Sequence, residues 1–493
     1  MFNVLCSKEI FEMENLTKLI EELRHLPNEA PWLEFKHNNF KPEIIGEDIS
    51  ALANSAAFSE RPRSYMIWGI DDKTHEIVGT EFDQYSLKIG NEELESWLRR
   101  LLSKNAEFEF HTVEMNDMRL VVLIIFKAAN QTVTFKKVDY IRVGSYTKKL
   151  SDYPQMQAQL WDRIRNTRFE EQYAKQDISA DEVFGLLDFN VYFDLKKEPL
   201  PSNMEGVLHY MLEEGVVAKQ DNGFYAITNM GAILFAKRLV AFPRLERKAV
   251  RVVQYQGNNK QNMLREDVGK KGYILEFNDH LKYIGALLPA KEVIVGGIRE
   301  SRSEYPEVAL REVLANALIH QDFSITGTSI VVEIFKDRVE ITNPGIPLVD
   351  VNRIVDNPPK SRNEKLASLM RRLGMCEELG TGWDKIILSC EVKQLPAPTI
   401  TIYEENTKVT LYSKRDFFDM QLEEKIWTCY MHACVKYVQG EYLTNSSLRE
   451  RFGLQEASSA SVSRLIKDAC AKGVIKKLMD TAPRYSKYMP YWA

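Results

Sequence analysis

The sequence predicts an α+β protein built from several domains, with a C-terminal winged helix-turn-helix. Its 493 residues exceed the length that one hydrophobic core usually serves. Helical and strand-like patterns alternate through most of the chain, which is typical of domains that mix helices and sheets. The C-terminal part instead carries two helical patterns joined by a tight turn. We therefore expect four domains, at residues 1–150, 151–247, 248–415 and 421–493.

The composition indicates an ordinary globular protein. Hydrophobic residues make up 44% of the chain and charged residues 27%, which argues against wholesale disorder. The six cysteines are dispersed and form no CxxC pair, which argues against a zinc site or a disulfide framework. The N-terminus has no basic start followed by an apolar run, and no stretch approaches the length of a membrane span. We expect a cytoplasmic protein without a membrane partner.

The charge distribution is uneven along the chain. The formal net charge of −5 is not typical of a nucleic-acid-binding protein, because such a surface should carry excess lysine and arginine. From Gln421 to the end, however, eleven Lys and Arg face seven Asp and Glu, a local balance of +4. This excess favours a C-terminal region that faces a polyanion.

The N-terminal domain combines helices with apolar strands. An amphipathic helical pattern at Leu16 to Leu23 ends at Pro27, and later runs are rich in β-branched and aromatic residues. The predicted strands are Ser64–Ile70, Leu120–Phe126 and Val138–Val143, with helices at Ile44–Ala57 and Glu92–Leu102 between them.

The middle of the chain holds two further units. Residues Tyr153 to Phe193 form a polar helical pattern, and Pro199–Pro201 is a plausible hinge. Beyond it we expect a helix at Met204–Glu214, strands at Val216–Lys219 and Phe224–Ile227, and then the central α+β domain. Its predicted elements are strand Lys248–Tyr255, helices Ile274–Leu288 and Val308–Leu318, and strands Ser329–Phe335 and Arg338–Thr342.

Acidic residues of the N-terminal domain form a candidate metal site. Glu29, Glu34 and Lys36 lie within EAPWLEFK, and Asp71 and Asp72 follow an apolar strand. Carboxylates from separate elements can hold Mg²⁺ or Mn²⁺, which polarises a phosphodiester and activates water, while Lys36 stabilises developing negative charge. The spacing alone favours the alternative, surface acids at a loop and a turn.

These segments resemble a known family. EAPWLEFK, NSAAF and WGIDDKTHEIVG are similar to the AlbA-type DNA-binding domain that bacteria share with the Schlafen family, over about residues 14–150. In nuclease-active relatives an E-x4-E pair and a downstream aspartate form a metal-dependent RNase site. The resemblance implies that Glu29, Glu34 and Asp72 hold the metal here, with Asp71 as the neighbouring alternative. The usual Gly-Gly before the strand reads Glu60 to Arg63 in this sequence.

A second candidate site lies near the middle of the chain. Glu312, Asn316 and His320 recur every four residues and therefore share one helical face. Two glycine-containing segments follow, VEITNPGIP at 339–347 and LGTGWDKI at 379–386. A glycine turn that opens a helix presents N–H donors to phosphate at the positive end of the helix dipole. The polar helical face could otherwise be solvated, with His320 as a structural residue.

That ordered set resembles a divergent form of the GHKL ATPase superfamily, over about residues 300–415. The resemblance implies a central α/β sandwich that binds ATP, with Mg²⁺ held by Asn316 and with Glu312 orienting the attacking water. Asn343 and Gly345 would border the adenine, and Gly380, Thr381 and Gly382 would cradle phosphate beneath a lid that contains Lys360 and Arg362. Asn343 replaces the family's adenine-reading aspartate, and Pro347 stands near a usual glycine, so nucleotide binding is favoured over hydrolysis.

The C-terminal region predicts helices at Ser446 to Phe452 and Ser459 to Lys472, with Gly473 as a stop. Core spacing of Val462, Leu465 and Ile466 leaves the opposite face outward. Helix residues Arg464 and Lys467 and the basic residues Lys476 and Lys477 are therefore candidates for nucleic-acid contact. A winged helix can also serve as a dimerisation module, which leaves a homo-oligomer open.

The modules together predict a nucleotide-responsive protein that binds DNA or RNA, as a transcriptional regulator or a defence-type factor. AlbA-type domains are often followed by divergent GHKL domains in predicted regulators. The first alternative is a Schlafen-like, divalent-metal-dependent RNase acting on tRNA-like substrates, for which the resemblance implies a role in antiviral defence. The second is an assembly scaffold whose two sites are degenerate. Whether the protein is an enzyme, as an RNase or as a weak ATPase, is left open by the residues.

Overall fold

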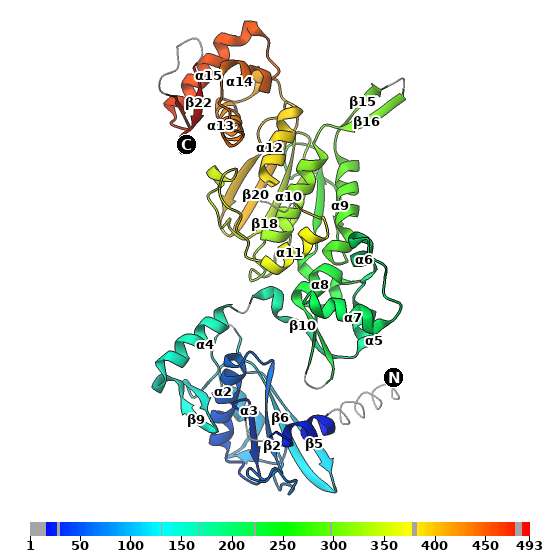
Figure 1. The fold of residues 1–493 in the computed structure, drawn as a ribbon, viewed down its shortest axis with the longest axis vertical. Coiled ribbons are helices and arrows are strands. Elements are labelled where there is room, and N and C mark those ends of the chain that lie inside the picture. The colour runs from blue at the N-terminus through cyan, green and yellow to red at the C-terminus, as the bar shows by residue number, and fades with distance from the viewer. Residues whose placement is uncertain are drawn as a thin grey trace. The chain divides into compact units, whose positions relative to one another are not determined.

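A computed structural model describes residues 16–26, 30–129, 131–166, 168–220, 223–295, 298–376, 382–478 and 486–493. The chain forms two compact units, one of residues 1–168 with 219–224 and one of residues 169–218 with 225–493. Both units mix helices with sheets, so the predicted α+β multidomain class is confirmed (Figure 1). Among the described residues, no helix combines the length and hydropathy needed to cross a membrane.

The first unit is built on a four-stranded sheet in the order β1-β2-β6-β5, in which only β1 and β2 run parallel. Helix α2 covers one face, and the helical residues 16–24 pack Leu19, Ile20 and Leu23 against the other. Its elements are β1 (Leu33–Lys36), α2 (Pro42–Phe58), β2 (Arg63–Trp68), β3 (Lys88–Ile89), β4 (Glu92–Glu93), α3 (Leu94–Leu101), β5 (Phe108–Met115), β6 (Met118–Phe126), β7 (Thr134–Phe135), β8 (Val138–Val143), β9 (Tyr146–Lys149) and α4 (Pro154–Asn166).

Side chains on successive residues of β1 face opposite sides of the sheet, as strand geometry requires. Leu33 and Phe35 join the core beneath the N-terminal helix, so Glu34 and Lys36 face the side covered by α2. The small sheet of β7, β8 and β9 packs on α2 as well, through backbone hydrogen bonds from β8 to Ser50 and Ser55. Two charged residues of β1 are thereby enclosed between the sheet, α2 and β8.

The second unit begins with a helical layer around a small sheet. Residues 173–178 form a strand, β10, whereas the sequence predicted a helical stretch there. The sequence YAKQDI lacks apolar alternation, and its strand state depends on antiparallel pairing with a partner about fifty residues later. The elements are β10 (Tyr173–Ile178), α5 (Ala180–Leu186), α6 (Asn190–Lys196), α7 (Met204–Glu213), β11 (Val217–Lys219), β12 (Tyr225–Thr228) and α8 (Asn229–Phe235).

The central part of this unit is a six-stranded sheet in the order β14-β13-β17-β18-β20-β19. Helices α9, α10 and α12 lie together over it (Figure 1). The elements are β13 (Arg251–Tyr255), β14 (Met263–Val268), α9 (Tyr273–Leu287), β15 (Ala290–Val295), β16 (Ile298–Ser303), α10 (Glu307–His320), β17 (Val331–Ile334), β18 (Arg338–Pro344), α11 (Glu364–Arg372), α12 (Gly382–Val392), β19 (Thr399–Tyr403) and β20 (Asn406–Tyr412).

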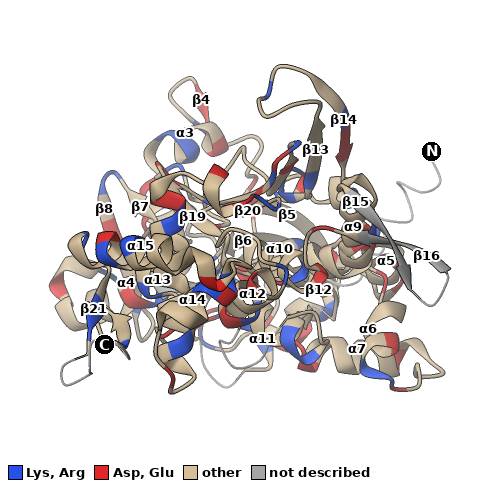
Figure 2. Cartoon of the chain, turned by 90° about the horizontal axis from the view of Figure 1, so that it is seen from above, with Lys and Arg blue, Asp and Glu red and all other residues tan. Residues whose placement is uncertain are grey.

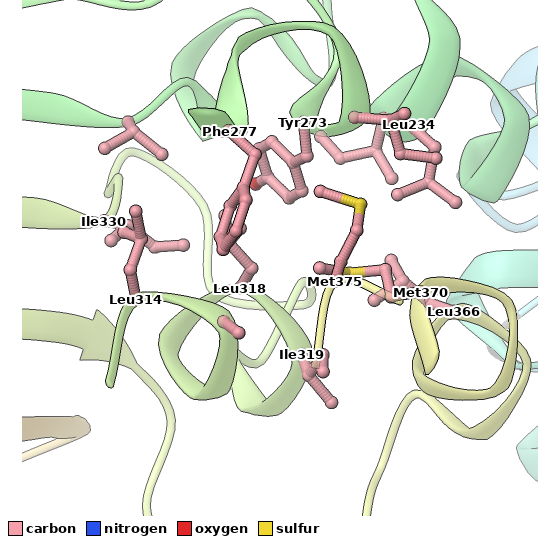
Figure 3. Close-up of a cluster of buried hydrophobic side chains, with 14 of the residues drawn as sticks. Leu234, Tyr273, Phe277, Leu314, Leu318, Ile319, Ile330, Leu366, Met370 and Met375 are labelled. Carbon is pink, nitrogen blue, oxygen red and sulfur yellow. The ribbon is translucent and has the colours of Figure 1, made fainter. Parts of the chain in front are cut away.

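One apolar core joins the helical layer to the sheet layer. Figure 3 shows Leu234 of α8 beside Tyr273 and Phe277 of α9, with Leu318 of α10 and Met370 of α11 opposite them. The same core continues from Ile178 to Leu411 without a break between the two layers. Burial of this shared surface is the main force that holds α10 against its neighbours.

The C-terminal module has three helices and an antiparallel hairpin. They are α13 (Leu422–Val438), α14 (Asn445–Arg451), α15 (Ser459–Ala471), β21 (Ile475–Lys477) and β22 (Tyr488–Pro490). Thr444 caps α14 by accepting a hydrogen bond from the Ser447 amide. Val462, Leu465 and Ile466 of α15 are buried, as their spacing predicted, and pack with the inner face of α13.

Candidate functional site

A cavity of about 440 Å³ lies in the second unit between α10, the sheet and a loop. Glu312, Asn316 and His320 line it from α10, so the predicted polar face of this helix points into the cavity. Ile341 and Asn343 of β18 line it from the sheet, together with Thr407 and Val409, their partners on β20. A cavity of this size, with an apolar floor and a few converging polar groups, is typical of a small-molecule site.

The polar end of the cavity depends on Gly382, the first residue of α12. A β-carbon at this position would lie 3.1 Å from Glu312 Oε2 and 3.8 Å from Asn316 Nδ2. Glycine therefore lets the start of α12 approach a carboxylate and an amide side chain closely. The other two residues of the predicted phosphate cradle, Gly380 and Thr381, lie outside the described residues.

Asn343 and Gly345 lie at the end of β18. The buried Asn343 donates a hydrogen bond from Nδ2 to the Pro344 carbonyl at 3.1 Å. Gly345 has φ +105°, and its backbone carbonyl accepts a hydrogen bond of 2.6 Å from Thr407 Oγ1. A β-carbon there would come within 2.9 Å of the Asp322 amide nitrogen. Asn343 lines the cavity, whereas Gly345 shapes the turn beside it.

The predicted lid divides into an exposed part and a fixed part. Lys360 and Arg362 both line the cavity, and Lys360 is exposed. Arg362 Nη1 donates hydrogen bonds to the carbonyls of His320, at 3.3 Å, and Ile346, at 3.0 Å. Asn363 donates to the carbonyls of Ile319 and Gln321, at 2.7 and 2.9 Å. These bonds tie the last carbonyls of α10 to the loop.

His320 is a neutral group at the cavity wall. Burial lowers its pKa to about 4, and the positive charge of Arg362 acts in the same direction. An imidazole held neutral at pH 7 can accept or donate a hydrogen bond but adds no positive charge for a phosphate. The cations that line the cavity are Lys360, Arg362 and Arg371.

The loop on the other side of the cavity contacts the C-terminal module. Val351 and Ile354 line the cavity, and Asn352 between them accepts a hydrogen bond at its carbonyl from Tyr430 of α13. The Arg353 guanidinium lies 5.0 Å from the ring centre of Trp492. Val355 is buried in the core of α13, α14 and α15. The segment 351–355 thus forms part of the cavity wall and part of the docking surface of that module.

Helix α12 connects the same two places. Its first residue approaches Glu312, and near its end Glu391 lies 3.1 Å from His432 Nδ1 of α13 and 3.2 Å from Arg451 Nε of α14. Burial would raise the pKa of Glu391, but the His432 hydrogen bond and the Arg451 charge outweigh it and lower the pKa. Breaking such a buried ion network is costly, so α12 and the C-terminal helices are firmly joined.

The acidic cluster of the first unit differs from the predicted one. Glu34 contacts both Lys36 Nζ and Arg142 Nη2, and Lys36 Nζ lies 3.6 Å from Asp48 of α2. Thr147 Oγ1 donates a hydrogen bond of 2.5 Å to Asp48 Oδ1. Burial raises the pKa of Asp48, whereas the charges of Asp48 and Glu34 overcome burial and raise the pKa of Lys36. The charges of the two carboxylates, Glu34 and Asp48, are thus offset by those of the two cations, Lys36 and Arg142.

The other predicted ligands of that site lie elsewhere. Glu29 is outside the described residues, and Asp72 is exposed. Asp71 accepts hydrogen bonds from the amides of Lys73 and Thr74, at 3.0 and 2.9 Å. The pKa of Asp71 is lowered, mainly by the bond from the Thr74 amide and next by the bond from the Lys73 amide. Across the described part of the chain, no group of three or more His, Cys, Asp or Glu side chains is placed to hold a metal ion.

Sequence reasoning missed Asp48 and Arg142, which complete the cluster. Glu34 and Arg142 are 108 positions apart and meet only because β8 packs on α2. One signal was present for Asp48, since two adjacent acids, Glu47 and Asp48, interrupt the otherwise mostly apolar and small residues of IIGEDISALANSAAF, and both cannot lie on the solvent side of the helix. A charge on a buried helical face requires a partner.

The basic residues proposed for nucleic-acid contact are exposed. Arg464 and Lys467 lie on the outer face of α15, and Lys476 and Lys477 lie on β21. None of the four forms an ion pair with another described residue. Their ammonium and guanidinium groups are therefore accessible to a polyanion.

Comparisons with known proteins agree with this architecture. The chain is a multidomain α/β protein that joins an AlbA-type domain to an ATPase-like domain. Residues 29–151 match the family described as "Schlafen, AlbA_2", and residues 327–411 match the family described as "Putative ATP-dependent DNA helicase recG C-terminal". Both predicted resemblances are confirmed at this level.

One solved structure is similar over almost the whole length. The DIP2311 protein from Corynebacterium diphtheriae shares 18% sequence identity, with 92% of this chain and 93% of that chain covered and a TM-score of 0.41. No curated protein matches the chain.

Proposed function

We propose that this protein is a nucleic-acid-binding regulator whose C-terminal module responds to a nucleotide bound in the cavity. The observation that carries the proposal is the double role of segment 351–355, which lines the cavity and docks α13. A ligand regulates a partner site only if it binds two conformations with different affinity. A wall shared by both sites supplies an element through which that difference can act.

The lining of the cavity fits a purine nucleotide such as ATP. Ile341 and Val409 offer an apolar surface to a base, and Asn343 offers a hydrogen-bonding amide beside them. The opposite, polar end has Glu312 and Asn316 next to the first residue of α12. There Asn316 would hold Mg²⁺ between phosphates, and Mg²⁺ would offset the charge of Glu312. We propose nucleotide binding with weak or absent turnover.

The C-terminal module would contact the nucleic acid as a winged helix. Its helices α14 and α15 and the hairpin β21–β22 have the element order of that fold, and Leu443 bridges to Tyr488 beside the hairpin. Helix α15 would enter a major groove with Arg464 and Lys467, while Lys476 and Lys477 would meet phosphates.

The proposal is tested with the full-length protein, a fluorescent ATP analogue and labelled duplex DNA. Asn316→Ala should weaken binding of the analogue and remove its effect on DNA affinity, whereas Asn258→Ala on an exposed loop should change neither. Arg464→Gln with Lys467→Gln should weaken duplex binding and leave the analogue bound. An analogue that binds Asn316→Ala like wild type, or that never alters DNA affinity, would contradict the proposal.

A second candidate is metal-dependent RNA cleavage by the first unit. It is favoured by one observation, that the carboxylates of Glu34 and Asp48 meet at the same Lys36 ammonium. Both acids are buried and Glu34 also contacts Arg142, so a divalent metal would have to replace the cation contacts of these carboxylates. Incubation with Mn²⁺ and labelled tRNA tests it, with Glu34→Gln against the exposed Glu95→Gln as control. Cleavage of equal rate in both variants would exclude this site.

A further inference from the structure

The hairpin β8–β9 of the first unit carries a strongly basic segment. Between residues 136 and 149, KKVDYIRVGSYTKK, five Lys and Arg accompany one Asp, a local balance of +4 in a protein of net charge −5. In Figure 2 basic residues, in blue, mark β8. Lys137, Lys148 and Lys149 are exposed and form no ion pair with another described residue. Three of the five cations therefore face solvent, whereas Arg142 is buried against Glu34 and Lys136 pairs with Glu43.

An aromatic side chain stands among these cations. Tyr146 is 69% exposed, so its ring is accessible to a ligand. The Lys148 ammonium lies 5.6 Å from the centre of the Tyr146 ring. An exposed ring next to a cation is the combination that binds an unpaired base by stacking and its phosphate by charge.

The hairpin is held rigidly from its inner side. Arg142 of β8 contacts Glu34, and Thr147 of β9 donates a hydrogen bond of 2.5 Å to Asp48. Because strand residues alternate, Tyr146 and Lys148 face away from Thr147 and from the cluster. The Tyr146 ring therefore lies on a strand that is already ordered, so little conformational entropy of the protein is lost when a base stacks on it.

A second exposed tyrosine of the same unit gives an internal contrast. Tyr85 is 70% exposed, but residues 81–95, EFDQYSLKIGNEELE, hold five acids and one lysine, a balance of −4. Phosphates would be repelled from that surface and attracted to the hairpin. Exposure of the ring is thus equal at the two places, and the sign of the surrounding charge differs.

We propose that the exposed surface of β8–β9 binds single-stranded nucleic acid, with Tyr146 stacking on a base and with Lys148, and the exposed Lys149 at the end of β9, contacting phosphates. The proposal rests on the proposed nucleic-acid-binding function and adds a second contact surface, distinct from the C-terminal one. A duplex keeps its bases stacked on one another, so the ring gains this contact only from an unpaired segment.

The test measures affinity of the full-length protein for fluorescein-labelled dT12, U12 and a 12-base-pair duplex. Tyr146→Ala should weaken binding of one or both single strands by roughly 5- to 150-fold, the range expected for one stacked base. Tyr85→Ala should bind like wild type, and Tyr146→Phe should retain affinity because the ring remains. Lys148→Gln with Lys149→Gln should lower the slope of log affinity against log salt by about 0.7 for each lost contact.

The outcomes separate this surface from the C-terminal module. Loss of single-strand binding in Tyr146→Ala, with the duplex still bound, supports the hairpin even if Arg464→Gln with Lys467→Gln has no effect. Equal single-strand affinity of Tyr146→Ala and wild type overturns the hairpin while leaving the C-terminal proposal intact. Equal losses in Tyr146→Ala and Tyr85→Ala, or a wild type that binds no single strand, also overturn it.

Discussion

Gly382 and Glu312 approach so closely that any β-carbon on the first would lie 3.1 Å from a carboxylate oxygen of the second. This contact joins the start of α12 to the middle of α10 at the polar end of the cavity. A shift of Glu312 would therefore displace the start of α12, and through it the C-terminal helices that α12 contacts.

Substitution of Gly382 by alanine should disturb the cavity without unfolding the protein. The added methyl group would displace Glu312 or the start of α12 by a few tenths of an ångström. We expect the ATP analogue to bind roughly tenfold more weakly or worse, because polar ligands tolerate little misplacement. The control is Gly285→Ala in α9, where a β-carbon meets nothing within 4 Å. Equal affinity of both variants would argue against a nucleotide phosphate near Gly382.

Tyr430 offers a way to separate nucleotide binding from its transmission. Its hydroxyl donates to the Asn352 carbonyl and accepts a hydrogen bond of 3.1 Å from Trp492 Nε1. Tyr430→Phe should leave affinity for the analogue within about fivefold of wild type, since a neutral hydrogen bond contributes only about 1 kcal/mol. The change in DNA affinity caused by the analogue should become smaller. Tyr437→Phe, on the same helix, should preserve the effect of the analogue on DNA affinity. An undiminished effect in Tyr430→Phe would mean that the Tyr430–Asn352 contact does not couple the cavity to the C-terminal module.

Arg142 should be essential for the stability of the first unit. Replacing it by methionine leaves the buried Glu34 without one of its two cations, which typically costs about 3–5 kcal/mol. Adding Glu34→Gln should recover part of that loss, because the uncompensated charge disappears. Urea denaturation of wild type, Arg142→Met and the double variant measures both effects. Arg119→Met, which breaks a half-exposed pair with Asp83, should cost less than about 1 kcal/mol.

His320 should make the second unit less stable as the pH falls. Its pKa is lowered to about 4 in the folded protein, against an ordinary value of 6.5. Between these values the unfolded chain binds a proton that the folded chain excludes, so the free energy of unfolding decreases from pH 6.5 to pH 4.

The comparison of wild type with His320→Gln isolates this contribution from other titrating groups. The wild type should lose on the order of 2 kcal/mol relative to the variant across that interval. His209→Gln, at a histidine that is 71% exposed on α7, should show no comparable trend. A difference between wild type and His320→Gln that stays constant with pH would mean that His320 is accessible to protons.

The predictable parts of the fold were those with a local cause. The β-branched and aromatic run Val138–Val143 is a strand with the predicted bounds, and the four-residue spacing of Glu312 and Asn316 does place them on one face of α10. Such patterns are set by residues near one another in sequence. The strand β14, MLREDV, was missed because all six of its residues are exposed and show no burial pattern.

The unpredictable parts depend on packing between distant segments. Nothing near Glu34 in the sequence indicates Arg142, and nothing near Asn352 indicates Tyr430. The first pair needs β8 to pack on α2, and the second needs the C-terminal helices to dock against a loop of the sheet layer. Local propensity carries no information about either contact, so the balanced cluster and the shared wall emerge only from the fold.

The unbroken core shown in Figure 3 sets where this chain can be divided. A fragment that begins at residue 248 would expose the face of α9 that packs against α8, and it should aggregate. A fragment that begins at residue 169 keeps both layers and should unfold in one cooperative step. Recombination between related genes would therefore yield a folded protein only if the small helical layer and the ATPase-like layer were transferred together.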